Sequence, residues 1–244
     1  MRYQTQYQVF HLMPSISCHI RCLLMFCMLA SGASARMCRI LFLDRPADAP
    51  KTLHLFDGEK IRQVELPGLN LSPVYQLPDG NLNLRFFRNP PADLKNLPES
   101  APSVRIAEEL TDVYLIMGSN PKNVVAPIHI QVVSADSANV SRGQMLWFNL
   151  TDKRVGGKVG TEKLDLKPLG SVRVAEPRQG TGDYPVELYF VIEGDAHLHP
   201  LCESQWQHDP RSRSLVFIAR NGNRRAPRIY SVSDFRVADK PEIE

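Results

Sequence analysis

The first 35 residues contain neither Asp nor Glu. Within them, Arg21 supplies a positive charge ahead of the apolar stretch 22–30, and residues 33–35 (Ala-Ser-Ala) have the small side chains of a signal-peptidase site. These are the three parts of a secretory signal peptide. We therefore predict that residues 1–35 form a cleaved signal peptide. The chain is then exported and is periplasmic, associated with the outer envelope, or secreted.

A long hydrophobic run is also missing. The apolar stretch of the leader is shorter than the roughly 20 residues that cross a bilayer as a helix. No second stretch of that length follows it. We expect no transmembrane span in the mature chain.

Net charge is low. The full sequence has a formal net charge of +3, and removal of Arg2 and Arg21 with the leader lowers it by two, to about +1. A near-neutral chain gives no global reason to bind nucleic acid. Export and the lack of an interleaved aromatic platform also disfavour nucleic acid as a partner.

Motifs of known catalytic sites are absent. The sequence has no H-E-x-x-H, no C-x-x-C pair and no G-x-S-x-G elbow, and these patterns mark metalloproteases, zinc sites and α/β-hydrolases. Residues 156–161 are rich in glycine but lack the order of a phosphate-binding loop, so we predict a flexible hairpin or bulge there. We expect neither enzymatic activity nor a cofactor.

Cysteines are few. Of the five in the sequence, Cys18, Cys22 and Cys27 fall in the leader, which leaves Cys38 and Cys202. An even number of cysteines in an oxidising compartment favours pairing. We therefore predict a disulfide between Cys38 and Cys202. Two isolated thiols are the alternative that the sequence leaves open.

Long helices are disfavoured by the many prolines of the mature chain. We predict at most a helical turn or two, at 92–97 and 105–110. The dominant period is two, which is typical of half-buried strands. Leu82, Leu84 and Phe86, for example, alternate with polar residues.

Similar short apolar runs recur along the chain, separated by turn-forming pairs such as Asp57-Gly58 and Asp79-Gly80. Strands are predicted at 38–43, 52–56, 61–66, 73–77, 81–86, 104–106, 113–117, 128–133, 144–149, 171–175, 184–192, 214–219 and 228–232. Many short strands at this spacing indicate β-sandwiches.

The most polar stretch near the centre of the chain is 118–123, which is rich in turn formers. A boundary here divides the chain into parts of ordinary domain size. We predict two tandem antiparallel β-sandwich domains at 36–118 and 126–236, a linker at 119–125 and a disordered tail at 237–244. A single larger sandwich, with this stretch as an ordinary loop, is the alternative.

Residues 38–118 combine a strand with the loop Arg45-Pro-Ala-Asp-Ala-Pro50, the corner Asp57-Gly58 and the corner Pro78-Asp79-Gly80. This pattern resembles an uncharacterised family of bacterial extracytoplasmic β-sandwich domains. It departs from the family in having Phe56 directly before Asp57-Gly58. The resemblance implies an all-β, immunoglobulin-like fold and a location in the cell envelope. It supplies no catalytic residues.

Histidines gather between residues 194 and 209. If this stretch is extended, His197 and His199 point to the same side, as two imidazoles on one metal ion require. His208 or Asp209 would then complete a metal site. The alternative is a polar loop that follows a long strand, with Trp206 packed over the end of the sandwich.

Arginines gather in the last part of the chain, in a stretch without acids. The candidate anion-binding residues are Arg211, Arg213, Arg220, Arg224, Arg225 and Arg228. Guanidinium groups bind carboxylate, phosphate or sulfate in a bidentate way, so an anionic glycan or a lipid headgroup would dock here. A solvated face, balanced by acids on a neighbouring strand, is the alternative.

Three classes of function follow. The first is a non-enzymatic envelope or secreted interaction module for assembly or adhesion, which binds an envelope or extracellular protein through sheet edges and end loops. The second is a binding module for an anionic glycan or lipid. The third is a metal-dependent hydrolase around His197, His199 and His208.

Overall fold

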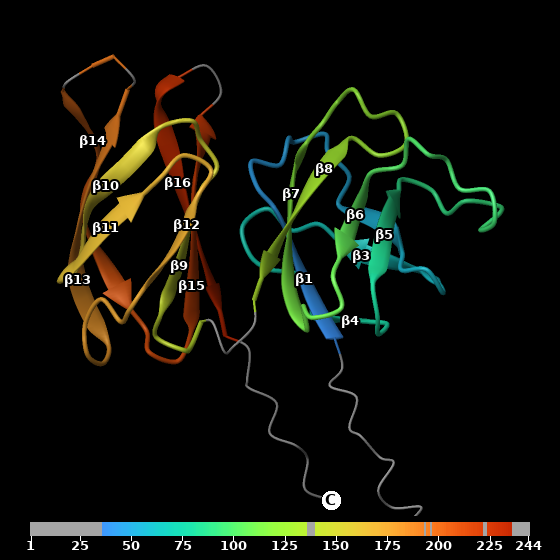
Figure 1. The fold of residues 1–244 in the computed structure, drawn as a ribbon, viewed down its shortest axis with the longest axis horizontal. Coiled ribbons are helices and arrows are strands. Elements are labelled where there is room, and N and C mark those ends of the chain that lie inside the picture. The colour runs from blue at the N-terminus through green and yellow to red at the C-terminus, as the bar shows by residue number, and fades with distance from the viewer. Residues whose placement is uncertain (1–35, 136–139, 193, 196, 222–223, 236–244) are drawn as a thin grey trace, which may run out of the picture. The chain divides into compact units, whose positions relative to one another are not determined.

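The computed structural model describes residues 36–135, 140–192, 194, 195, 197–221 and 224–235. The predicted signal peptide and the predicted tail lie outside these residues. Over the described residues the chain is all-β, with sixteen strands in four four-stranded sheets and no helix (Figure 1). The helical turns predicted at 92–97 and 105–110 are therefore wrong, and Arg105 lies in a strand. The described part of the chain contains no helix that is long and apolar enough to span a membrane.

The first four-stranded sheet has the order β4-β1-β7-β8, and its partner has the order β3-β2-β5-β6. The strands are β1 (Arg36–Phe42), β2 (Thr52–Phe56), β3 (Ile61–Glu65), β4 (Tyr75–Leu77), β5 (Leu82–Phe87), β6 (Ser103–Ile106), β7 (Asp112–Ser119) and β8 (Ile128–Ser134). We call these two sheets the first pair.

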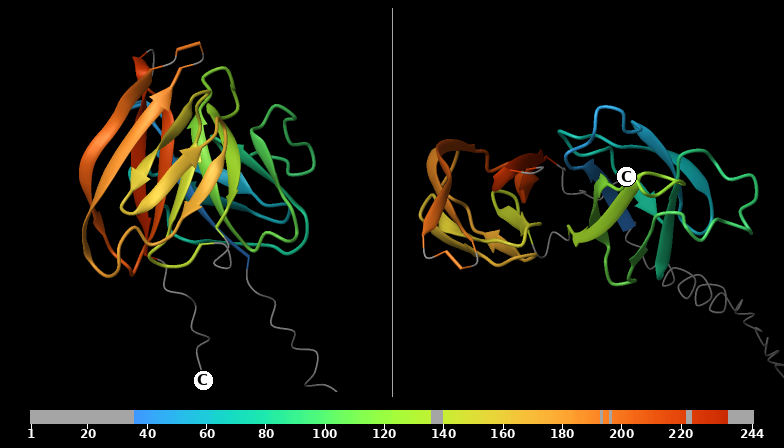
Figure 2. Two further views of the ribbon diagram at one scale, coloured as in Figure 1. Left: turned by 60° about the vertical axis from the view of Figure 1, so that its left-hand side comes forward. Right: turned by 90° about the horizontal axis from the view of Figure 1, so that it is seen from above.

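The second pair consists of a sheet with the order β12-β9-β15-β16 and a sheet with the order β11-β10-β13-β14. The strands are β9 (Met145–Asn149), β10 (Arg154–Val159), β11 (Glu162–Leu166), β12 (Ser171–Val174), β13 (Gly182–Val191), β14 (Leu198–His208), β15 (Arg213–Asn221) and β16 (Arg224–Asp234). Figure 2 shows the layers of each pair from two further directions.

Two of the four sheets are mixed, which differs from the predicted wholly antiparallel sandwiches. β1 pairs in parallel with β7, and β9 pairs in parallel with β15. Parallel strands are usually buried on both faces and read as continuous apolar runs. The sequence of β7 has this property, because each residue from Val113 to Met117 is buried.

Three hydrophobic cores explain this burial. A first core lies within the first pair and a second core within the second pair. A middle core takes side chains from β1, β7, β9, β15 and β16, and so joins one sheet of each pair. The alternation along β15 is typical: Val216 and Ile218 enter the second core, whereas Leu215 and Phe217 enter the middle core.

A buried polar cluster borders the middle core. The Asp234 carboxylate has no exposed surface and lies 2.6 Å from the Arg39 guanidinium and 3.3 Å from that of Arg213. It also accepts a hydrogen bond from the Tyr114 hydroxyl at 2.5 Å. Buried charges need such partners because an unpaired charge loses its hydration without compensation.

The change from the first pair to the second lies elsewhere than predicted. Ser119 ends β7, and the connection that follows leads into β8, which pairs with β7 in the same sheet. The stretch predicted as a linker, 119–125, thus belongs to a hairpin of the first pair. The chain passes to the second pair after Ser134. All described residues belong to one compact unit, and the division into two domains stays a prediction.

The predicted disulfide is wrong. Cys38 is buried in the first core, and Cys202 packs at the border of the second core. The two thiols are not bonded to each other. They belong to sheets of different pairs, and spacing in the sequence cannot report this separation. Burial raises the pKa of the Cys202 thiol above its ordinary value.

Candidate functional site

Two groups of residues that are separate in the sequence meet at one end of the second pair. The Arg225 guanidinium, next to the β15–β16 turn, lies 3.6 Å from the Asp195 carboxylate in the β13–β14 connection. The Arg220 guanidinium lies 3.3 Å from Asp152, in the connection from β9 to β10. We call this region the basic end; it comprises Asp152, Lys153, Asp195, His197, His199, Arg220, Arg224 and Arg225.

A buried asparagine fixes the turn that carries Asp152. Asn149 is fully buried, and its Nδ2 donates to the carbonyl oxygens of Lys153 at 2.6 Å and Lys167 at 3.0 Å. Its Oδ1 accepts from the Thr151 hydroxyl at 2.7 Å. Buried amides that use both ends in this way hold a turn in one conformation. The turn then presents Asp152 to Lys153 and Arg220.

Hydrogen bonds to Asp152 and Asp195 keep both carboxylates ionised. The Lys153 ammonium, followed by Arg220, holds the pKa of Asp152 below its ordinary value. The pKa of Asp195 is lowered to about 2, first by the His197 backbone N–H and then by the His197 and His199 rings. The ring nitrogens of these histidines lie 2.9 and 2.8 Å from the carboxylate. Acceptance of such bonds favours the charged form of a carboxylate.

Most side chains of the basic end reach into solvent. The His197 side chain is 88% exposed, that of Arg220 72% and that of Arg225 68%, whereas Asp195 is only 25% exposed. Exposed ion pairs contribute roughly 0–1 kcal/mol. The arginines can therefore exchange an aspartate for the anionic group of a ligand at small cost.

Of the other predicted arginines, Arg211 and Arg213 lie at the other end of β15, whereas Arg228 pairs opposite Ala219, next to Arg220. Arg213 is wrong as a ligand-binding residue, because its side chain is only 8% exposed and its guanidinium bonds to Asp234 and the Ala135 carbonyl. Arg211 forms a two-bond pair with Asp209 at the same end of β15 as Arg213, away from Arg220. The Arg228 guanidinium lies 5.0 Å from the centroid of the Tyr230 ring.

The three predicted metal ligands are not assembled. His208 pairs with Gly182 at the far end of β14, whereas His199 pairs with Phe190 at the near end. His208 is buried, and its ring meets the edge of Tyr184. In the part of the chain that the structure describes, no three His, Cys, Asp or Glu side chains are arranged to hold a metal ion.

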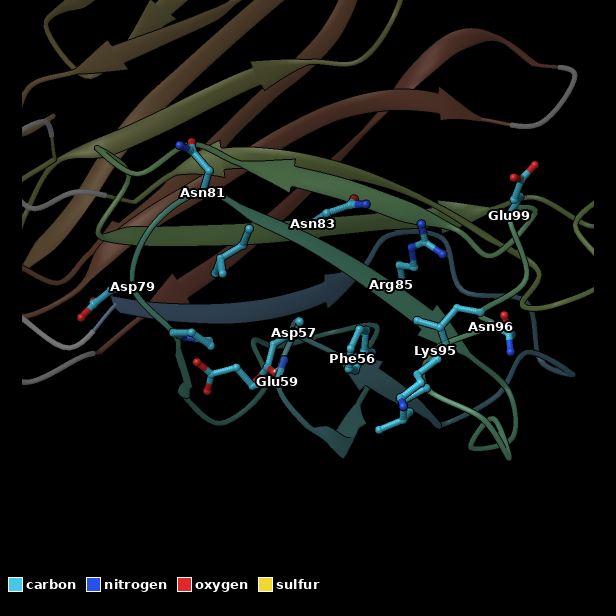
Figure 3. A pocket seen from close by; sticks show the side chains of 15 residues that line it. Phe56, Asp57, Glu59, Asp79, Asn81, Asn83, Arg85, Lys95, Asn96 and Glu99 are labelled. Carbon is cyan, nitrogen blue, oxygen red and sulfur yellow. Dashed lines mark hydrogen bonds between the residues drawn. The ribbon is translucent and has the colours of Figure 1, made fainter.

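A polar pocket of about 670 Å³ on the first pair was not predicted (Figure 3). It is lined by β5, by the β2–β3 turn and by the connection around residues 94–99. Asn81, Asn83 and Arg85 line one wall. The sequence does carry a signal for this wall, because these residues alternate with buried Leu82, Leu84 and Phe86.

A second hollow, of about 550 Å³, lies on the outer face of the sheet formed by β11, β10, β13 and β14. Gly156 is central to it, between Tyr189 and Asp165 on the neighbouring strands. The exposed side chains of Tyr189 and Leu198 contribute apolar surface to this hollow.

No family model matches the sequence, and no curated protein does. The resemblance of residues 38–118 to envelope sandwich domains therefore stays a prediction. Among solved structures, the chain is similar to the Bacillus anthracis TIE protein, with 8% identity and a TM-score of 0.24 over 82% of this chain. The match covers 34% of that structure, so the chain spans about a third of its length. A likeness this weak carries no argument about function.

Proposed function

We propose that this protein is an exported, non-enzymatic binding module that holds an acidic polysaccharide at its basic end. The observation that carries the proposal is the contact between Arg225 and Asp195. Through this contact, the β15–β16 turn region, which carries the arginines, and the β13–β14 connection, which carries Asp195 and His197, contribute to one exposed surface. Lys153, Arg220, Arg224 and Arg225 outnumber Asp152 and Asp195 on that surface, so it attracts anions.

The form of the surface favours a polymer with repeated negative charges. Its cationic groups come from the β9–β10 connection and from the adjoining ends of β15 and β16, and they project into solvent, as the exposure of Arg220 and Arg225 indicates. Several weak, exposed contacts add up along a repeating ligand, whereas one small anion would use only one of them. Guanidinium groups also match the paired oxygens of carboxylates and sulfates.

The proposal is tested by the affinity of the purified protein for heparin, used as a sulfated polysaccharide. The double variant Arg220→Gln/Arg225→Gln should bind at least about tenfold more weakly, because two charge-assisted contacts are lost. The matched control is Arg178→Gln/Arg211→Gln, which removes the same charge from exposed arginines outside the basic end. Binding should also weaken as salt is raised.

Equal losses in the two double variants would contradict the proposal, since total charge alone would then explain the binding. Tighter binding to vesicles that contain phosphatidylglycerol than to heparin would contradict the class of ligand. Retention of heparin by the basic-end variant at full affinity would assign the binding to another surface.

A further inference from the structure

Arg85 differs from most arginines of the described chain in having no partner there. It is half-buried on β5, opposite Phe56 of β2 and Ser103 of β6. Its guanidinium makes no hydrogen bond or ion pair with any other described residue. By contrast, Arg36, Arg39, Arg62 and Arg154 all bond to carbonyl or carboxylate oxygens.

The Arg85 guanidinium is therefore available to a ligand, because no bond to another described residue has to be broken first. A ligand that supplies two oxygens can form two charge-assisted hydrogen bonds with Arg85. Arg85 also lines the polar pocket, so there is room for such a ligand. The pocket volume lies within the usual range for small-molecule sites.

The other walls of the pocket offer amide groups. Asn81 uses its Oδ1 to accept from the Glu108 backbone N–H, and Asn96 uses its Nδ2 to donate to Asp93. The Nδ2 of Asn81 and the Oδ1 of Asn96 thus remain available to a ligand. Asn83 and Arg85 lie on one face of β5, Asn81 directly precedes the strand, and Lys95 and Asn96 lie on the connection opposite (Figure 3). Amides both donate and accept, which suits hydroxyl groups.

Acidic residues limit the charge that the ligand can carry. Four acidic residues lie on the pocket lining: Asp57 is buried and paired with Arg62, whereas Glu59, Asp79 and Glu99 are exposed. They repel a ligand with several negative charges, such as a nucleotide. A single carboxylate at Arg85 is compatible with them. Phe56, directly across from Arg85, adds a half-buried aromatic surface for the apolar face of a ring.

We propose that this pocket binds a sugar that bears one carboxylate. The carboxylate pairs with Arg85, the hydroxyl groups bond to the amides of Asn81, Asn83 and Asn96, and the ring faces Phe56. This site lies on the first pair of sheets and does not depend on the basic end of the second pair. A protein that holds no polysaccharide at its basic end would still bind the sugar here.

The test is a titration of the full chain, labelled with ¹⁵N, with glucuronate, glucose and acetate, followed by NMR. Glucuronate should shift the backbone signals of Phe56, Asn83 and Arg85, and glucose and acetate should bind at least about tenfold more weakly. Arg85→Gln should reduce glucuronate affinity about tenfold or more. Arg88→Gln removes an exposed arginine outside the pocket and should leave the affinity unchanged.

A second variant, Asn83→Asp, tests the proposal if Arg85→Gln fails to fold. Asn83→Asp keeps the shape of the side chain and adds a negative charge beside the carboxylate, so glucuronate should bind about tenfold more weakly. Equal binding of glucuronate and glucose, or of glucuronate and acetate, would overturn the proposal. Equal losses in Arg85→Gln and Arg88→Gln would overturn it as well.

Discussion

Two adjacent glycines in β10 show how differently single residues depend on the fold. Gly157 has a φ of +149°, and a Cβ atom there would lie 1.9 Å from the Glu187 carbonyl oxygen. A Cβ atom at Gly156 would meet only the Leu164 carbonyl oxygen, at 3.5 Å. The backbone therefore requires glycine at 157 and tolerates a side chain at 156.

This contrast gives a stability prediction. Gly157→Ala should lower the free energy of unfolding by about 2 kcal/mol or more, because it combines a strained φ with a clash against backbone. Gly156→Ala is the matched control and should change it by less than about 1 kcal/mol. Urea denaturation of both variants measures the difference. Similar losses in the two variants would contradict the prediction.

The pKa of Asp195 gives a prediction about pH. Because the folded-state pKa is about 2, below the ordinary value of 3.8, ionised Asp195 contributes stability above pH 4. This contribution is lost as the pH falls towards 2. The difference in unfolding temperature between the natural protein and Asp195→Asn should therefore shrink from pH 5 to pH 2.5. A difference in unfolding temperature that does not depend on pH would contradict the lowered pKa of Asp195.

At the scale of elements, period two in the sequence predicts the strands that have one buried face, such as β2, β5 and β13. Those predictions are confirmed. β10, β11 and β14 are not among the predicted strands, although residues 156–161, predicted as a hairpin or bulge, do lie in the β10–β11 hairpin. β10 contains Gly156 and Gly157, which weaken a strand pattern. β14 is an edge strand with exposed polar residues along most of its length, and the sequence leaves this stretch open between an extended segment and a polar loop. Local sequence cannot report the neighbour that pairs with such a strand.

The β9–β10 turn gives a prediction at the same scale. Asn149→Ala should lower the free energy of unfolding by about 1–3 kcal/mol, because it leaves the Lys153 and Lys167 carbonyl oxygens without their donor. It should also weaken heparin binding, since the same turn carries Lys153, one of the cationic groups of the basic end. Urea denaturation and heparin affinity measure the two effects. Asn70→Ala, an exposed control outside both proposed sites, should change neither by much, and an equal effect would contradict this role of Asn149.

At the scale of the whole molecule, the sequence predicts an all-β chain but not which sheets share a core. The apolar runs of β7 and β15 indicate strands buried on both faces, but they do not say that the middle core joins them. Because the sequence does not show which sheets come together, it also led to the wrong disulfide and to the wrong assignment of Arg213 as a ligand-binding residue. Both depend on contacts between residues far apart in the chain, such as the 3.3 Å contact between Arg213 and Asp234. The basic end was predicted only as two separate groups for this reason.

Substitution of Asp234 tests whether the buried polar cluster beside the middle core stabilises the protein. Asp234→Ala leaves Arg39 and Arg213 without their shared carboxylate and should lower the free energy of unfolding by about 3–5 kcal/mol. Asp209→Ala removes an exposed pair with Arg211 and should cost at most about 1 kcal/mol. Denaturation followed by tryptophan fluorescence measures both. A small loss for Asp234→Ala would contradict a structural role of the buried cluster.

The most direct test of the account is to locate bound polysaccharide on the protein. NMR spectra recorded with and without a short heparin oligosaccharide show which backbone signals move. The account predicts shifts concentrated at Lys153, Asp195, Arg220 and Arg225, with the signals around Arg211 and Arg213 unchanged. Shifts spread evenly over the surface, or concentrated away from the basic end, would contradict it.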